Sequence, residues 1–503
     1  MLTDEELMLL VQLEYLYSRK GKAAGAAGSP EAGNEPAEAS GKTEVRSCAA
    51  GSPEAGNEPA ADSGKTEVRN GSAAASGKTE VRSASANAFG AAEKERAVLP
   101  GSQEHSRLKR EFLKQEERAA ILRVIRKNKH LLSLYVWGRD DNVFATCYRD
   151  AEGKAYVTFR GTSTGEEWLD NLEGSFAVDT KSQKEALEYV EALPFDRITV
   201  AGHSKGGNKA QYVALLSDKV DRCVSMDSQG FSREFVEAYS ARIAANSYKI
   251  KNYSLATDYV HVQLLEVPGA QQIYCQGDQR FVGLGNHSPA AFYQYYRDEN
   301  GVLQIVLNDR GQTNLILTTE NEGIHCLHEF TCFLLEHVPD DRRERAVRYL
   351  GNTLALTMRK EYTVCENGEV YTHDTRIAYI FSDQETAAFL IAYLLKFSDT
   401  NELTDEQFLS LLDAFGLKDT YLVLMGLTLN MLGTTFYERG KSFRGFLLSS
   451  IKSSRRNFLI EAALGIVHKT WLKRHLQKKV GTDFDPRKLW RDIQKEYSLI
   501  ENV

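Results

Sequence analysis

The sequence predicts an α/β protein, with a mainly parallel sheet flanked by helices and a mainly helical C-terminal region. Two observations support this fold class. Between residues 144 and 258, short runs rich in β-branched and aromatic residues are separated in several places by helical runs, an alternation typical of parallel α/β sheets. From about residue 325 onward, apolar residues recur at the spacing of helices instead.

The expected elements follow the apolar runs along the chain. We expect a continuous helix at 116–137, helices at 183–193 and 209–218, and strands at 144–150, 155–162, 197–204, 222–230 and 248–258. In the C-terminal region the clearest helical runs are 386–397, 405–415 and 456–476. The run closest to a membrane span, 421–437, is interrupted by Asn430, glycines and threonines, which favours a buried helix.

Residues 18–98 differ in composition from the rest of the chain. No Leu or Ile lies between Leu16 and Leu99, and two segments repeat: GSPEAGNEPA at 28–37 and 51–60, and SGKTEVR at three places. These repeats lack the apolar positions with which repeat units stack, so they predict a disordered insert. The first 17 residues have apolar residues on one face at helical spacing, which predicts a helix of the globular body.

Charge and cysteine content exclude some classes of function. The 503 residues carry a net charge of −7, which argues against general nucleic-acid binding. The seven cysteines are odd in number and form no CxxC pair, which indicates reduced thiols and a cytoplasmic location. The acidic start of the chain lacks the positive region of a signal peptide.

A serine lies between glycines where an expected strand meets an expected helix. Gly202, Ser204 and Gly206 satisfy G-x-S-x-G within ITVAGHSKGGNKAQYVALL. Such a turn strains the backbone at the serine, and the glycines remove side chains that would clash. The following helix points its N-terminus at the reacting oxygen, so the N–H of Lys205 is placed to donate to an oxyanion. The motif predicts Ser204 as a nucleophile.

A nucleophilic serine needs a histidine that accepts its proton and an acid that orients the histidine. His287, in the glycine-rich loop GLGNHSPAAFYQYY, is the first candidate for the base, and His261 is the second. Asp258 and Asp227 each end a strand-like run, so the residues alone leave both open as the acid. His203 is expected to point the other way along the strand and to serve in packing.

The segments GHSKGG and YVTFRGTSTGEEWLDNL, and their order, resemble the class 3 (fungal-type) lipases of the α/β-hydrolase fold. They resemble more closely an uncharacterised bacterial branch of that lipase-like group. The resemblance covers residues 1–17 loosely and about 130–300 more firmly. It implies a second oxyanion donor at Thr162, the catalytic histidine at His287, and Asp258 in preference to Asp227 as the acid.

The chain departs from the family pattern at two places. Trp168 matches the tryptophan near the start of the family's lid, but the lid region 165–171 carries Glu166, Glu167 and Asp170. A lid that opens onto lipid is expected to be more apolar, so interfacial activation is not favoured. Lys205 replaces the family's usual leucine, although its backbone N–H can still serve as an oxyanion donor.

Two further patterns lie in the C-terminal region. His325, His328 and Cys332 share one helix face, and zinc could add a ligand such as His337, but this spacing matches no closed zinc motif. We therefore expect no metal. Residues 439–480 are basic, with Glu461 as their single acid, and such helices can lie on an anionic membrane surface or pack as a solvated bundle.

These observations predict a serine hydrolase that acts on carboxylic esters, with a lipid-like substrate implied by the resemblance alone. The predicted parts are an N-terminal helix of the hydrolase body (1–17), the insert (18–98), an α/β-hydrolase domain (99–320) and a helical region (321–503). No cofactor is expected. The alternative is a non-catalytic lipase-like scaffold whose helical tail binds a protein partner or a membrane. Acyl transfer and thioester or amide cleavage share the same motif chemistry.

Overall fold

The computed structural model describes residues 1–16, 113–161, 170–171, 173–281, 283–358, 362–366, 368–414, 417–418, 421–422, 425, 442–452, 460–462, 464–465 and 485–500. Several predictions from the sequence concern residues outside these ranges. They are the insert at 18–98, the oxyanion donor Thr162, Trp168 of the expected lid, and most of the runs 421–437 and 439–480.

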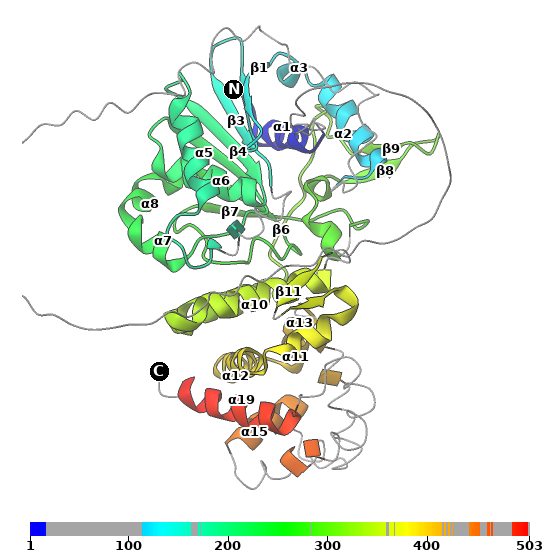
Figure 1. Cartoon of the computed structure of the whole chain (residues 1–503). Helices are drawn as coiled ribbons and strands as arrows, with labels where there is room; N and C mark the ends of the chain where they lie inside the picture. The colour runs from blue at the N-terminus through cyan, green and yellow to red at the C-terminus, as the bar shows by residue number, and fades with distance from the viewer. Residues whose placement is uncertain are drawn as a thin grey trace, which may run out of the picture. The chain divides into compact units, whose positions relative to one another are not determined.

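The centre of the N-terminal part is an eight-stranded sheet of order β1-β2-β3-β4-β5-β6-β7-β10 (Figure 1). Its parallel strands are β3 (Ala155–Phe159), β4 (Ile198–His203), β5 (Val220–Met226), β6 (Ile250–Leu255) and β7 (Gln271–Cys275). The outer strands β1 (Tyr135–Asp140), β2 (Ala145–Arg149) and β10 (Leu317–Thr318) pair antiparallel. The predicted fold class, α/β with a mainly parallel sheet, is confirmed.

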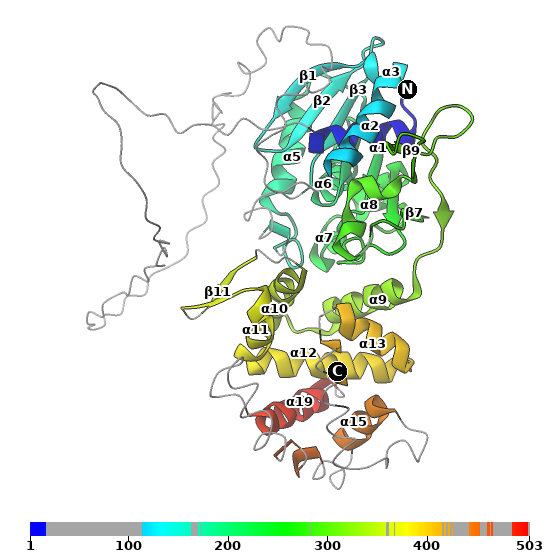
Figure 2. The same cartoon turned by 90° about the vertical axis from the view of Figure 1, so that its right-hand side faces the viewer.

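Helices cover both faces of this sheet (Figures 1 and 2). On one face, the core joins the strands to α5 (Lys181–Ala192), α6 (Lys205–Leu216), α7 (Arg233–Ala238) and α8 (Ser240–Asn246). On the other face it joins them to α1 (Asp4–Leu16), α2 (Gln115–Lys127) and the 3-10 helix η3 (Pro289–Phe292). Every residue of β3 and β4 is buried, as expected for strands that are covered on both sides.

The helix α1 is buried around most of its circumference, and not only on the single apolar face that the leucine spacing predicts. It lies between the strands, α2 and η3, so its polar side chains must find partners inside the core. Gln12 Nε2 donates to the carbonyl of Pro289 at 2.7 Å. Glu14 Oε1 accepts a hydrogen bond of 2.7 Å from Thr158 Oγ1. The hydrogen-bond partners of these side chains of α1 are therefore distant in the sequence.

The prediction of one continuous helix over 116–137 was wrong at its C-terminal end. The helix α2 ends at Lys127, the single turn α3 (Lys129–Leu132) follows, and β1 begins at Tyr135. Asn128 interrupts the helix because its backbone is extended and its side chain accepts from the N–H of Leu131 at 3.0 Å. Residues 135–140 then pair with β2 as an antiparallel hairpin.

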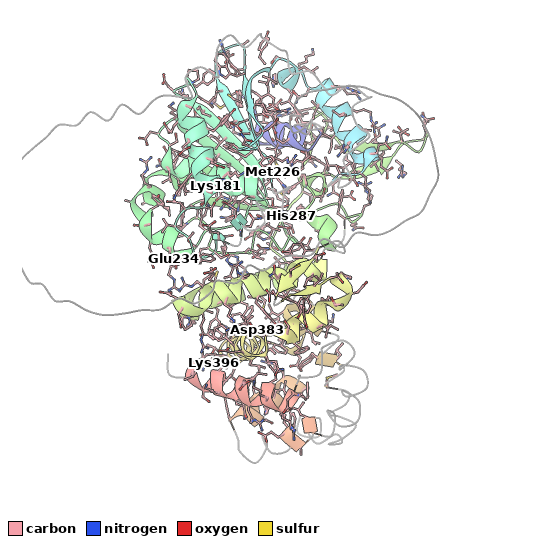
Figure 3. The ribbon with its side chains drawn as sticks, in the orientation of Figure 1. Lys181, Met226, Glu234, His287, Asp383 and Lys396 are labelled. Atoms are coloured by element: carbon pink, nitrogen blue, oxygen red, sulfur yellow. The ribbon has the colours of Figure 1, made fainter. Side chains whose placement is uncertain are left out.

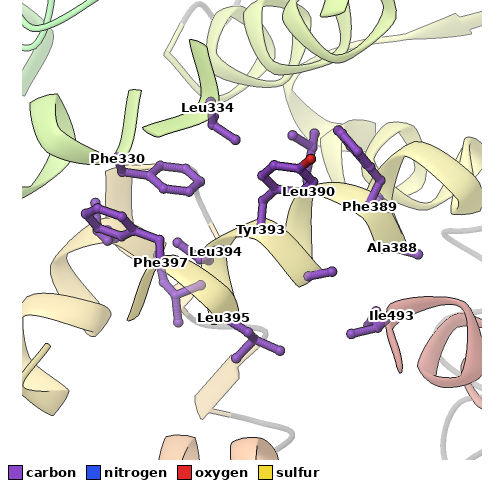
Figure 4. Close-up of a cluster of buried hydrophobic side chains, with 14 of the residues drawn as sticks. Phe330, Leu334, Ala388, Phe389, Leu390, Tyr393, Leu394, Leu395, Phe397 and Ile493 are labelled. Atoms are coloured by element: carbon purple, nitrogen blue, oxygen red, sulfur yellow. The ribbon is translucent and has the colours of Figure 1, made fainter. Parts of the chain in front are cut away.

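The C-terminal part is mainly helical, as predicted. Its elements are α9 (Glu322–His337), α10 (Asp340–Met358), α11 (Arg376–Ser382), α12 (Gln384–Thr400), α13 (Asp405–Ala414), α15 (Phe443–Ile451), α19 (Pro486–Ile500) and the strands β11 (Val364–Glu366) and β12 (Glu369–Tyr371). The cluster in Figure 4 shows their core, in which Phe330 of α9 and Phe397 of α12 have ring centroids 5.3 Å apart. Within the described ranges, no helix has both the length and the apolar character that a membrane crossing requires.

Candidate active site

Ser204 occupies a strained turn between a strand and a helix. The strand β4 ends at His203 and the helix α6 begins at Lys205. The φ angle of Ser204 is 59° and its ψ angle is −129°, a conformation that residues with a Cβ atom rarely adopt. Its backbone N–H donates to the carbonyl of Met226, the last residue of β5, at 2.9 Å. The turn expected from G-x-S-x-G is therefore present, with the serine at its tip.

The glycines of the motif are required because backbone segments approach them closely. A Cβ atom on Gly202 would lie 2.1 Å from the carbonyl oxygen of Gly206. A Cβ atom on Gly206 would lie 2.3 Å from the carbonyl oxygen of Phe159, at the end of β3. No real Cβ atom tolerates such distances from backbone, so both positions exclude every residue but glycine. The turn can thus lie directly against the end of β3.

Ser204, His287 and Asp258 form a connected hydrogen-bonded chain. His287 Nε2 lies 2.8 Å from Ser204 Oγ, and His287 Nδ1 lies 2.9 Å from Asp258 Oδ1. The histidine ends the 3-10 helix η2 (Gly283–His287), and the aspartate follows β6. Figure 3 labels His287 together with Met226, whose carbonyl holds the turn at Ser204. The three residues predicted as nucleophile, base and acid therefore lie together.

The carboxyl group of Asp258 is held in its ionised form. Burial raises its pKa, but the positive charge that His287 carries when it is protonated, the contact with His261 and the hydrogen bond from His287 outweigh burial and hold this pKa well below its usual range. An ionised Asp258 accepts the Nδ1–H of His287, which leaves Nε2 as the acceptor toward the serine hydroxyl. This is the tautomer that a general base requires.

The second candidate acid, Asp227, lies beside Asp258 but does not bind His287 Nδ1. Its Oδ1 accepts from the backbone N–H of Leu255, the last residue of β6, at 2.7 Å. Complete burial, and next the charge of Asp258, raise the pKa of Asp227 well above its usual value. The two acids thus differ in charge: Asp258 is ionised and Asp227 is neutral.

His203 and Tyr15 form a supporting layer behind the triad. The hydroxyl of Tyr15 lies 2.8 Å from His203 Nδ1 and accepts a 3.0 Å hydrogen bond from the backbone N–H of Gly161. The His203 ring packs against the His287 ring, with centroids 4.8 Å apart. Burial lowers the pKa of His203 well below its usual value, so this ring is neutral. The packing role expected for His203 is consistent with this position, but nothing in the motif pointed to Tyr15.

The side chain of Lys205 is buried and forms an ion pair with Asp170. Its Nζ lies 2.7 Å from Asp170 Oδ2. The same carboxylate accepts hydrogen bonds from Thr180 Oγ1 at 2.9 Å and from the backbone N–H of Ser182 at 3.0 Å. Asp170, which we counted among the acidic side chains of an expected lid, is therefore an internal partner of the residue after the nucleophile. Sequence reasoning considered the backbone of Lys205 and missed its side chain.

The backbone N–H of Lys205 is in the first turn of α6, where N–H groups lack carbonyl partners within the helix. This position fits the expected oxyanion donor. The second expected donor, Thr162, directly follows the last described residue of that segment, Gly161, and stays a prediction.

Groups that could hold a metal coincide with the triad region. Among the described side chains, the converging sets are His203, Asp227 and His287, and Asp227, Asp258 and His261. The histidines of α9 that we weighed as zinc ligands are not among them. His325 Nδ1 instead contacts Glu320 Oε2 at 2.9 Å, and His337 Nδ1 lies 3.0 Å from the carbonyl of Phe333.

Comparison with known proteins agrees with this geometry. Residues 138–289 match the family model described as Mbeg1-like, which is a lipase-like family. The matched range begins in β1 and includes Ser204, Asp258 and His287. No curated protein matches the chain. The likeness therefore supports a lipase-like hydrolase at the level of the family. It covers strands β2 to β7 and the candidate triad, while β10 and the C-terminal helices lie outside it.

Proposed function

We propose that this chain is a serine hydrolase that cleaves carboxylic esters through an acyl-enzyme on Ser204. The observation that carries the proposal is the position of His287, which contacts the serine hydroxyl with one ring nitrogen and a buried carboxylate with the other. The strained backbone of Ser204 and the match to a lipase-like family support it.

In the first half of the reaction, Ser204 Oγ attacks the carbonyl carbon of the ester while His287 Nε2 takes the hydroxyl proton. The electron pair of the carbonyl bond moves to its oxygen and gives a tetrahedral oxyanion. The backbone N–H of Lys205 donates to this oxyanion, and the N-terminus of α6 adds favourable electrostatic potential. Thr162 is the proposed second donor. Asp258 stabilises the imidazolium that forms at His287.

Acylation ends when the tetrahedral intermediate collapses and the bond to the alcohol oxygen breaks. The leaving alcohol takes the proton from His287, and the acyl group stays on Ser204. Water then attacks the acyl carbon while His287 accepts one of its protons, and the proton returns to Ser204 Oγ as the acid departs. Apart from the ester and water, each proposed step uses side chains and backbone groups of this chain.

We further propose that the substrate is a lipid-like ester. A lipid-like ester is supported by the likeness to lipase-like sequences. Contact of residues 439–480 with an anionic membrane stays a prediction from their basic composition, since most of that stretch lies outside the described residues.

A screen with p-nitrophenyl esters of increasing chain length tests the proposal. We expect hydrolysis by the full chain, a loss of at least about 10³-fold in Ser204→Ala, and no loss in Ser240→Ala, an exposed serine at the start of α8. Equal activity of Ser204→Ala and the parent protein would contradict the proposal. A well-folded protein that cleaves none of the esters would favour the non-catalytic scaffold.

A further inference from the structure

Two imidazole rings face the carboxylate of Asp258, one at each oxygen. His287 Nδ1 lies 2.9 Å from Oδ1, and His261 Nδ1 lies 3.5 Å from Oδ2, an ionic contact slightly longer than a good hydrogen bond. The backbone N–H groups of Val260 and His261 also donate to Oδ2, at 3.0 and 3.1 Å. Asp258 and His261 are both buried. The reaction proposed above uses only the first of these two imidazoles.

A second carboxylate holds the far side of the His261 ring. His261 Nε2 lies 3.0 Å from Glu320 Oε1, while the other oxygen of Glu320 contacts His325 Nδ1 at 2.9 Å. A neutral imidazole has one N–H and cannot donate toward two carboxylates on opposite sides. The position between Asp258 and Glu320 is therefore one for an imidazolium ion, in which both ring nitrogens carry protons.

The charges around His261 agree with this protonation state. Burial lowers its pKa, but the contacts with Asp258 and Glu320 and the charge of Asp258 raise it to about 9. Glu320 is itself held ionised, because the contacts with His261 and His325 outweigh the effect of burial and lower its pKa. The other titratable groups that act on or feel the charge of this ring are Asp227, Glu266 and His328, and His325 shares the Glu320 carboxylate with it.

In the resting enzyme, the imidazolium of His261 can supply the positive charge that the carboxylate of Asp258 lacks. Before the reaction, His287 must be neutral in order to accept the proton of Ser204, so it cannot then supply a full positive charge to Asp258. A buried carboxylate without a compensating cation tends to take up a proton. A fixed positive charge on the other oxygen keeps Asp258 ionised and aimed at His287 Nδ1.

We propose that His261 is a positioning residue for the triad: as an imidazolium held by Glu320, it keeps the Asp258 carboxylate ionised and oriented while His287 is neutral. This inference rests on the proposed hydrolase function. Glu320 lies just before α9, and two contacts fasten this part of the chain to the segment that carries Asp258 and His261. Asn321 N donates to Ala256 O at 3.0 Å, and Thr331 Oγ1 donates to Val262 O at 2.7 Å.

The first test is His261→Gln, with ester hydrolysis measured from pH 5 to 10. We expect kcat to fall by about 10²-fold with KM changed less than about twofold, because the loss lies in the chemical step and not in binding. Without the positive charge at residue 261, the charge of Asp258 holds a proton more strongly on His287. The acid limb of the kcat/KM profile therefore moves to higher pH, by about one unit. A lower kcat with an unmoved acid limb would overturn the proposal.

The matched control is His328→Gln on α9. Burial lowers the pKa of His328, so this ring is neutral and its replacement removes no charge. We expect its acid limb to coincide with that of the parent protein. If both variants move the limb equally, the shift reflects a general disturbance of α9 and the proposal is wrong.

A measurement without turnover separates this inference from the proposed function. NMR of ¹³C-labelled histidine follows the protonation of His261 directly. We expect His261 to stay charged at pH 7 and to titrate near pH 9. A neutral His261 at pH 7 would overturn the inference even in an active enzyme. A charged His261 at pH 7 in a protein that cleaves no ester would retain the imidazolium beside Asp258 and reject the hydrolase.

Glu320→Gln serves if His261→Gln does not fold. It keeps the shape of the side chain and removes the second carboxylate, so the titration midpoint of His261 is expected to fall by about one unit. Above the new midpoint, kcat of this variant should decline at a pH where the parent protein is still active. An unchanged midpoint of His261 would overturn the proposal.

Discussion

Nζ of Lys205 lies 2.7 Å from Oδ2 of Asp170, beside the nucleophile, and the lysine side chain is only 1% exposed. Burial raises the pKa of Asp170, but the charge of Lys205 and hydrogen bonds from Lys205 and Ser182 outweigh it and lower this pKa. The pair joins the first residue of α6 to the residue that follows the segment 162–169. The pair thus fastens the side chain of the residue after the nucleophile to Asp170.

Breaking this pair is expected to destabilise the fold. Asp170→Asn leaves a buried ammonium without its carboxylate, so we expect the free energy of unfolding to fall by about 3 to 5 kcal/mol at pH 7 in urea denaturation. Because the pKa of Asp170 is lowered on folding, the ionised carboxylate stabilises the protein above pH 3.8 and loses this effect as pH falls further. The difference from the parent protein should stay constant between pH 7 and about 5 and narrow below about pH 4.

An exposed ion pair provides the control for that variant. Asp218 pairs with Arg242 at 3.0 Å but is 87% exposed. Asp218→Asn should change the free energy of unfolding by less than about 1 kcal/mol. Equal effects of the two substitutions would show that the Lys205–Asp170 pair has no special role in stability.

Tyr15→Phe tests the supporting layer behind the triad. The substitution removes the hydroxyl that bonds both His203 Nδ1 and the N–H of Gly161, so we expect a loss of about 1 to 3 kcal/mol in stability. Gly161 directly precedes Thr162, so kcat should fall by about tenfold at nearly constant KM. Tyr248→Phe, at a tyrosine that is 77% exposed, should change neither quantity. An unaltered kcat in Tyr15→Phe would contradict a link between this hydroxyl and the reaction.

Gly206→Ala tests the close approach of the turn to β3. Its new Cβ atom would lie 2.3 Å from the backbone oxygen of Phe159, so the protein must unfold or shift the turn. We expect a stability loss of about 3 kcal/mol or more by thermal denaturation. At Gly277 the nearest atom would be 3.4 Å away, an ordinary contact, and Gly277→Ala should cost far less. A similar melting temperature for both variants would argue against the tight turn.

The two neighbouring aspartates are expected to respond differently to amide substitution. Asp258→Asn removes the carboxylate that orients His287, so kcat should fall by about 10⁴-fold. Asp227→Asn replaces a carboxyl group that is already neutral and keeps the oxygen that accepts from Leu255 N, so kcat and stability should change little. The reverse pattern in steady-state kinetics would assign the role of triad acid to Asp227.

The nucleophile and the base of the candidate triad were predictable because their signals are local. Gly202 is needed for a contact within the turn and Gly206 for the close approach of the turn to β3, while His287 lies in a glycine-rich loop. Local signals did not separate Asp258 from Asp227, and the preference for Asp258 came from the resemblance to the class 3 lipases. The parallel sheet followed from the same alternation of strands and helices. Such short-range patterns reflect backbone requirements that a single sequence displays.

The supporting residues were not predictable because their partners are distant in the sequence. Tyr15 is 188 residues from His203, and Glu320 is 59 residues from His261. No local pattern marks either pair, and their proximity results from the packing of α1 and of the segment before α9. The prediction of helix at 135–137 was wrong for a similar reason. These residues form a strand because they pair with β2.

Labelling with a fluorophosphonate probe tests the central claim most directly, because the probe reacts only with an activated serine hydroxyl. Mass spectrometry of the intact protein and of its peptides then identifies the modified residue. We predict one covalent adduct on Ser204, strongly slowed in His287→Gln and absent in Ser204→Ala. An adduct on another serine, or none on the folded full-length chain, would contradict the account.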